Sequence, residues 1–193
     1  MATKKPEAQV IELPRLEIKT FKLRLVGDSA LICHAWSEKA KSMMLDTQMK
    51  RAKSARPAKD PEQDYRDSLY HLEGGGHGFP AVAFKAAAVD ACSHIAGVTK
   101  VEARGAFHIA GDMVRIEGEP SMREDMVRVG MGTADIRYRG EFKKWAVELL
   151  IRHNARVLSA EQVANLFNTA GFAIGVGEWR PQRDGSFGMF HVE

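Results

Sequence analysis

The C-terminal quarter of the chain constrains the fold more than any other stretch, because it reads as strand, helix, glycine-rich loop and final strand. Apolar and polar residues alternate over Trp145–Ile151, the period of a strand that buries one face. Ser159 and Gln162 can form a capping box, and apolar residues then recur at helical spacing until Gly171. The loop Gly175–Gly188 carries four glycines, two arginines, a tryptophan and a proline. This composition is typical of a loop that brings its backbone close to an anionic ligand.

The preceding residues supply the other elements of a mixed fold. Phe21–Val26 alternates as a strand, and residues 30–34 continue as extended chain. Capping residues and apolar spacing predict helices over about residues 38–53, over a short segment of about 60–72, and after Phe79-Pro80, with Gly97 ending the last one. Residues 101–136 read as short strands and hairpins, with 105–111 and 113–117 joined near Gly111-Asp112.

Two strand–helix–strand halves around an antiparallel sheet make the ferredoxin-like arrangement. We therefore expect an α+β fold with a ferredoxin-like core, an antiparallel sheet, and inserted helices and hairpins. Residues 1–14 are polar and bounded by prolines, which predicts a flexible arm. Residues 15–193 then form one domain, with a helical insertion at about 38–78.

Composition narrows the class of protein. A hydrophobic content of 45% supports a buried core, and a net charge of +3 argues only weakly for a polyanionic partner. Cys33 and Cys92 have no zinc or redox spacing, which suits a reducing cytoplasm. No signal peptide and no run of about 20 apolar residues is visible, so we expect a cytoplasmic protein without a membrane partner.

Catalytic motifs are scarce. The segment Gly74–Gly78 lacks the Lys-Ser/Thr of a P-loop, and the glycines at 175 and 177 follow a helix where a Rossmann fingerprint would follow a strand. No histidine–carboxylate cluster indicates a metal, and no cofactor is expected. His34 adjoins Cys33, but neighbours on a strand point to opposite faces. A protein without enzymatic activity is the better prediction.

Three groups of cations could bind nucleic acid. The helical segment 38–59 is rich in lysine and arginine, including Lys50, Arg51 and Lys53, and has one balancing acid after its first residue. It fits a phosphate contact or an ordinary solvated face. Arg137 and Arg139 share one face of a strand, with Tyr138 on the other, and here too both interpretations stay open.

The glycine-rich loop gives the third group, Trp179, Arg180 and Arg183. Trp179 could stack on bases, as could Phe187, while the arginines neutralise phosphates. The structural alternative is that Trp179 plugs the core and the arginines pair with Glu178 or Asp184. We favour the binding interpretation, because the loop ends a helix and faces the sheet.

Two segments resemble the CRISPR-associated RAMP superfamily, especially its Cas7-like backbone proteins, including phage- and prophage-encoded relatives. The segment Phe79–Ala91 is similar to that superfamily's proline-containing entry into a helix with a basic residue, here Lys85. The segment Gly171–Phe190 is similar to its glycine-rich loop before a final strand. The chain departs from the pattern at residues 81–83, where Ala-Val-Ala replaces small hydroxyl residues.

The resemblance implies a modified RNA-recognition-type fold and a subunit that self-assembles as a filament along single-stranded RNA or DNA in a bacterial host cell. It assigns Lys85 to the phosphates and an inserted hairpin to the space between bases. Two alternatives remain open at this point. One is a metal-independent endoribonuclease, as other RAMP members are, which would need a histidine such as His34 or His77. The other is a structural or assembly protein that binds only protein.

Overall fold

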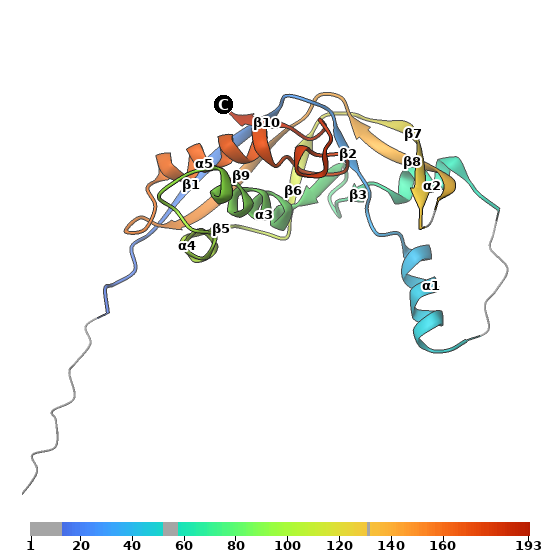
Figure 1. Cartoon of the computed structure of the whole chain (residues 1–193), viewed down its shortest axis with the longest axis horizontal. Coiled ribbons are helices and arrows are strands. Elements are labelled where there is room, and N and C mark those ends of the chain that lie inside the picture. Colours follow the sequence, from blue (N-terminus) through green and yellow to red (C-terminus); the bar gives the residue numbers. More distant parts are fainter. Residues whose placement is uncertain (1–12, 52–57, 131) are drawn as a thin grey trace, which may run out of the picture.

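The computed structural model describes residues 13–51, 58–130 and 132–193 as an elongated α+β molecule (Figure 1). Its strands are β1 (Ile18–Gly27), β2 (Leu31–Cys33), β3 (Tyr70–His71), β4 (His77–Pro80), β5 (Phe107–Ile109), β6 (Met113–Glu117), β7 (Pro120–Val129), β8 (Thr133–Phe142), β9 (Ala146–Asn154) and β10 (Phe190–Val192). Its α-helices are α1 (Glu38–Gln48), α2 (Pro61–Asp67), α3 (Ala81–Ala91), α4 (Lys100–Ala106) and α5 (Ala160–Ala173), and short 3₁₀ turns occupy Cys92–His94 and Pro181–Arg183.

The central sheet has the ferredoxin-like strand order. β10, β1, β9 and β6 lie side by side, and each neighbouring pair is antiparallel. α3 lies between β1 and β6 in the chain, and α5 connects β9 to β10, so each half is a strand–helix–strand unit. β4 and β3 extend the sheet beyond β6, and β5 pairs with the far end of β9. The predicted α+β, ferredoxin-like core with an antiparallel sheet is confirmed.

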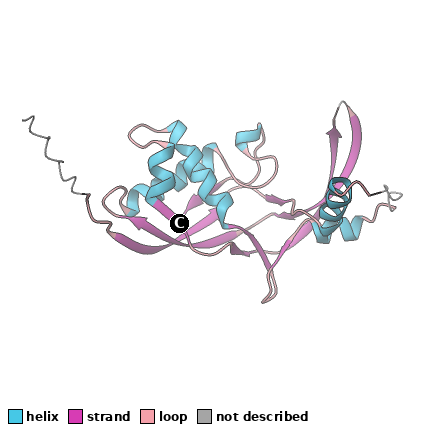
Figure 2. Ribbon diagram, turned by 90° about the horizontal axis from the view of Figure 1, so that it is seen from below, coloured by secondary structure: helices cyan, strands magenta, loops and turns pink. Residues whose placement is uncertain are grey.

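The core lies between one face of this sheet and the helices α3 and α5, which Figure 2 shows on the same side of the strands. Alternation decides which side chains enter it: Leu25 of β1 and Val147 and Leu149 of β9 are fully buried. Phe84 of α3 and Phe167 of α5 are buried against them. Each such side chain contributes about 2 kcal/mol of transfer free energy, so this face accounts for much of the stability.

The outward side chains of β1 and β9 are mostly polar or charged. Lys22 pairs with Glu148 across the two strands at 2.8 Å, and Arg24 reaches Glu117 of β6 at 2.7 Å. The aromatic residue of β1, Phe21, points inward, where its ring meets that of His153. These two central strands therefore offer ion pairs to the outside and no aromatic platform for bases.

A second sheet extends the molecule at one end. β7 and β8 form a long hairpin, and β2 pairs with the base of β8, in the order β2-β8-β7. α1 and α2 fall within the predicted 38–78 insertion, and α1 projects from this end (Figure 1). Both helices are shorter than predicted. α1 cannot continue through Lys50, because that residue has a positive φ of 55°, and α2 ends at Asp67.

The prediction of strands and hairpins over residues 101–136 was wrong in two places. Residues 100–106 form α4, whose capping box joins Thr99 and Glu102. β5 and β6 do not pair with each other; both pair with β9. The local chemistry of Gly111-Asp112 predicts a hairpin, but the pairing of both strands depends on β9, which lies far along the chain. The long hairpin is β7–β8.

Candidate nucleic-acid interface

The glycine-rich loop between α5 and β10 is fixed in place by backbone hydrogen bonds. Glu178 N–H donates to Ile32 O at 3.1 Å, and Gly188 N–H donates to Ala30 O at 2.8 Å, so the loop lies along β2. Val176 N–H donates to Gly188 O and closes the loop on itself. Gly188 has φ of 65°, and a Cβ there would lie 1.7 Å from Val176 O. The glycine is required by this close approach.

The loop presents three of the predicted residues together. Trp179, Arg180 and Arg183, with Glu178, line a cavity of about 370 Å³. The Trp179 side chain is 42% exposed, and its backbone has a positive φ of 55°. Such a conformation is uncommon for a bulky residue and recurs at functional sites. The structural alternative, in which Trp179 plugs the core, does not describe this loop.

Neither loop arginine is neutralised by an acid. Arg180 donates to Gly177 O at 3.0 Å and to Gln182 Oε1 at 3.2 Å, and Gln182 in turn donates to Asp90 of α3. Within the ranges that the structure describes, neither Arg180 nor Arg183 forms an ion pair. Both guanidinium groups therefore keep their charge available at the surface.

Glu178 is occupied on the inner side of the loop. Its Oε1 lies 3.5 Å from His34 Nδ1, and its Oε2 lies 3.9 Å from Arg139. The hydrogen bond with His34 and the charge of Arg139 lower the pKa of the carboxyl group, against the effect of burial. The structural alternative, in which Glu178 pairs with the loop arginines, is thus replaced by pairing of Glu178 with Arg139 of β8 and with His34 after β2.

The base of the β7–β8 hairpin contains a second set of arginines, and these are paired. Arg139 is only 3% exposed and reaches Asp125 at 3.2 Å. Arg123 bonds Asp125 and Glu141, each at 2.8 Å, and lies over the ring of Phe187 at 4.6 Å. This network joins the loop to the hairpin. It places Arg139 in the interior, which corrects the expectation of a surface cation there, and it covers one face of Phe187.

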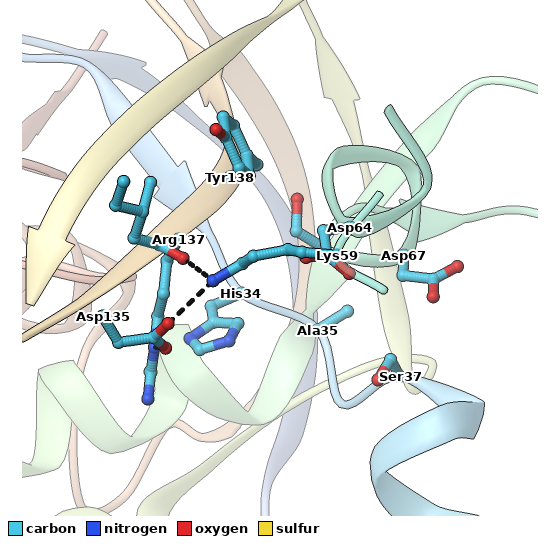
Figure 3. A pocket seen from close by; sticks show the side chains of 11 residues that line it. His34, Ala35, Ser37, Lys59, Asp64, Asp67, Asp135, Arg137 and Tyr138 are labelled. Carbon is cyan, nitrogen blue, oxygen red and sulfur yellow. Dashed lines mark hydrogen bonds and ion pairs between the residues drawn. The ribbon is translucent and has the colours of Figure 1, made fainter. Parts of the chain in front are cut away.

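A polar cleft of about 190 Å³ lies beside this network, between α2, β8 and the end of β2 (Figure 3). It is lined by His34, Arg137 and Tyr138, among others. Lys59 crosses the cleft to Asp135 at 2.7 Å and to the carbonyl of Ile136. Among the described residues, no group of three or more acidic, histidine or cysteine side chains could hold a metal.

Lys85 lies on a different side of α3 from the residues that face the loop. Its Nζ donates to Arg104 O at 3.1 Å and approaches His108 Nδ1 at 3.0 Å. Burial lowers the pKa of this ammonium group. Sequence reasoning did not pair Lys85 with His108, because α3 and β5 meet only through the helix–sheet packing.

The predicted cations at the end of α1 are remote from the loop. Lys50 and Arg51 follow α1, and Arg51 pairs with Asp46 at 3.0 Å. Lys53 lies outside the described residues. The predicted cations therefore fall into separate groups: those of the loop, those of the hairpin, Lys85, and those that follow α1. His77 is half-buried, with its ring 5.8 Å from that of Phe142 and 5.3 Å from that of His71.

Comparison with known proteins gives little beyond the fold. No protein-family model matches the sequence, and no curated protein matches it. Among solved structures, the crystal structure of Cmr6 from Pyrococcus furiosus is similar with a TM-score of 0.48 and 9% identity, over 93% of this chain and 100% of that chain. A likeness this weak carries no argument about function. None of the helices in the described ranges is long and apolar enough to cross a membrane.

Proposed function

We propose that this protein binds single-stranded nucleic acid, RNA or DNA, through the glycine-rich loop and catalyses no reaction on it. The observation that carries the proposal is the exposed Trp179 between glycines, beside two arginines that no described acid neutralises. An exposed indole can stack on any base, and guanidinium groups can neutralise phosphates, without reading sequence. The ring is held on a loop with many backbone bonds, which reduces the entropy cost of binding.

The other predicted residues differ in how directly they would contact the nucleic acid. Arg137 lies on β8 next to the cleft. Among the described residues it forms an ion pair with Asp135 alone, at 3.6 Å, so it can extend the binding surface beyond the loop. Lys85, Lys50 and Arg51 would contact more distant phosphates. Arg139 is left out, because its charge is used inside the protein.

We further propose that the protein self-assembles along its ligand as a Cas7-like RAMP subunit in the bacterial cytoplasm. None of the described residues of α1 is buried, and Met43, Met44 and Leu45 on it are exposed. A helix of 11 residues is marginal in water without tertiary contacts. Contact with a neighbouring copy would stabilise it. The buried, unpaired thiols of Cys33 and Cys92 suit a reducing compartment.

Charge reversal at the loop tests the proposal. The double variant Arg180→Glu/Arg183→Glu should bind a labelled single-stranded oligonucleotide at least about tenfold more weakly, and its affinity should depend less steeply on salt. The matched control is Lys143→Glu/Lys144→Glu, which changes the net charge equally at an exposed turn before β9. Equal losses in both variants would indicate a general charge effect, and unchanged affinity in the loop variant would remove the loop from the interface.

A metal-independent endoribonuclease is the second candidate. His34 is better placed than His77 to be its catalytic histidine. His34 lines the polar cleft with Arg137 and Tyr138, and Glu178 contacts its Nδ1. A histidine oriented by a carboxylate beside a cation is suited to acid–base chemistry on a ribose hydroxyl. Incubation of end-labelled RNA with the wild type and with His34→Ala separates the two functions. RNA left intact by the wild type supports binding alone, whereas cleavage lost on His34→Ala supports the nuclease.

A further inference from the structure

The edge of the sheet at β5 gathers positive and titratable side chains from three elements. Lys85 projects from α3, His108 from β5, and Arg152 from β9, where it is the cross-strand partner of His108. Lys85 Nζ lies 3.0 Å from His108 Nδ1 and faces the ring of Phe107 at 5.9 Å. The ammonium group thus rests against an imidazole and an aromatic ring, where a carboxylate would be the usual neighbour.

Acidic partners are missing from this cluster. Over residues 13–51, 58–130 and 132–193, neither Lys85 nor Arg152 forms an ion pair, although Lys19, Lys22 and Arg24 of β1 each do. A cavity of about 260 Å³ opens beside Lys85 and His108, which line it together with the turn of Gly111 and Asp112. Asp112 is the one acid among the residues that line it. Positive charge that faces an open cavity without a partner attracts an anion.

We propose that Lys85, His108 and Arg152 form a phosphate-binding site whose occupancy is coupled to protonation of His108. A tetrahedral oxyanion in this cavity can accept hydrogen bonds from Lys85 and from the imidazole of His108. Arg152, the cross-strand partner of His108, adds its positive charge nearby. That the bound phosphate belongs to a nucleic acid rests on the proposed function. That the site binds a phosphate group at all does not rest on it. The cavity lies apart from the glycine-rich loop, so it adds a separate point of contact.

The coupling to protons follows from the groups that surround His108. Burial lowers the pKa of His108, and the charges of Lys85 and Arg152 lower it further. Arg104 contributes its backbone carbonyl to Lys85, and Asp112 faces the same cavity. The neutral imidazole accepts the hydrogen bond from Lys85 through Nδ1. A bound dianion would favour the imidazolium form, so binding should take up a proton and become tighter as the pH falls.

Sulfate and inorganic phosphate are suitable probes, because sulfate keeps its charge across the range in which histidine titrates. Each ion is titrated into the full-length protein while the histidine side-chain signals are followed by ¹H–¹⁵N NMR. Measurements at about pH 8 and about pH 6 lie on either side of the usual histidine pKa. We expect the His108 signals to shift, with sulfate binding several-fold tighter at the lower pH.

Three variants make the assignment specific. Lys85→Met and His108→Gln should each weaken binding of the ions about tenfold, the effect of one charge-assisted hydrogen bond. Glutamine can still accept a hydrogen bond from Lys85 but cannot be protonated, so the effect of His108→Gln measures the contribution of the protonated imidazole. His94→Gln, at an exposed position in the turn after α3, should change nothing. Circular dichroism confirms that each variant is folded.

The outcomes separate this site from the loop. If neither ion shifts the His108 signals at either pH, the site is refuted, whatever the loop variants show. If the ions bind as expected and His108→Gln also abolishes the pH dependence of oligonucleotide binding, the site contacts the nucleic acid. If the ions bind but oligonucleotide affinity is the same in His108→Gln as in the wild type, the assignment to nucleic acid is overturned and the site takes free phosphate.

Discussion

The two sets of arginines where the glycine-rich loop meets the base of the β7–β8 hairpin have the same chemistry and opposite surroundings. Arg139 and Arg123, at the base of the β7–β8 hairpin, lie opposite each other in the strand register and would repel without the carboxylates of Asp125 and Glu141. On the adjoining loop, Arg180 bonds to the uncharged Gly177 O and Gln182, and among the described residues neither Arg180 nor Arg183 forms an ion pair. The first set holds the loop against the hairpin, and the second leaves its charge for a ligand.

The difference shows what residue type alone cannot tell. A buried charge needs partners, because desolvation in the interior costs several kcal/mol per ion. A surface charge needs none. The hairpin arginines should therefore affect folding and the loop arginines should affect binding, and each prediction below tests one side of that division.

The largest expected effect comes from Arg139→Leu. Removal of this guanidinium leaves Asp125 nearly buried and short of one partner, which should lower the free energy of unfolding by about 3 kcal/mol. Urea denaturation followed by circular dichroism measures it. The control is Arg137→Leu, two residues away on the same strand but partly exposed, which should cost less than about 1 kcal/mol. Similar losses in the two variants would contradict the buried network.

The next effect concerns the backbone of the loop. Gly188→Ala places a methyl group against Val176 O at a positive φ, so we expect a loss of about 2 kcal/mol in stability and weaker oligonucleotide binding. Gly105→Ala in α4 is the matched control, since its Cβ would meet no atom within 4 Å. That substitution should raise stability by about 0.5 kcal/mol. A loss of stability in Gly188→Ala and a gain in Gly105→Ala would distinguish a required glycine from a replaceable one.

Local patterns were sufficient for much of the fold. The alternation of Trp145–Ile151 and the capping box of Ser159 and Gln162 correspond to β9 and α5, with both capping bonds present. The prediction of strand over residues 101–106 is wrong, and Thr99 and Glu102 form a capping box of the same kind there. That signal was present in the sequence and could have identified α4.

The site was less accessible from sequence, for a physical reason. Strand periodicity places Arg137 and Arg139 on one face of β8, yet Arg139 is buried, where Asp125 of β7 and Glu178 of the loop approach it, and Arg137 is partly exposed. The pairing of Glu178 with His34 joins residues more than 100 positions apart. Contacts of this range depend on packing that leaves no local signature. The exposure of Trp179 could be argued from its glycine-rich surroundings, whereas the Lys85–His108 contact could not.

Trp179→Ala has the smallest expected effect on the fold and tests the binding side most directly. The indole lies outside the hydrophobic core cluster, so the variant should unfold at a denaturant concentration closer to that of the wild type than Arg139→Leu does. Loss of one stacked base should weaken oligonucleotide binding about tenfold, because stacking contributes about 1–3 kcal/mol per base. Trp179→Phe keeps a ring for stacking and should retain most of the affinity. Fluorescence anisotropy of a labelled oligonucleotide measures both variants. A Trp179→Ala protein that unfolds as easily as Arg139→Leu would place this tryptophan with the hairpin arginines, as a residue that holds the structure together.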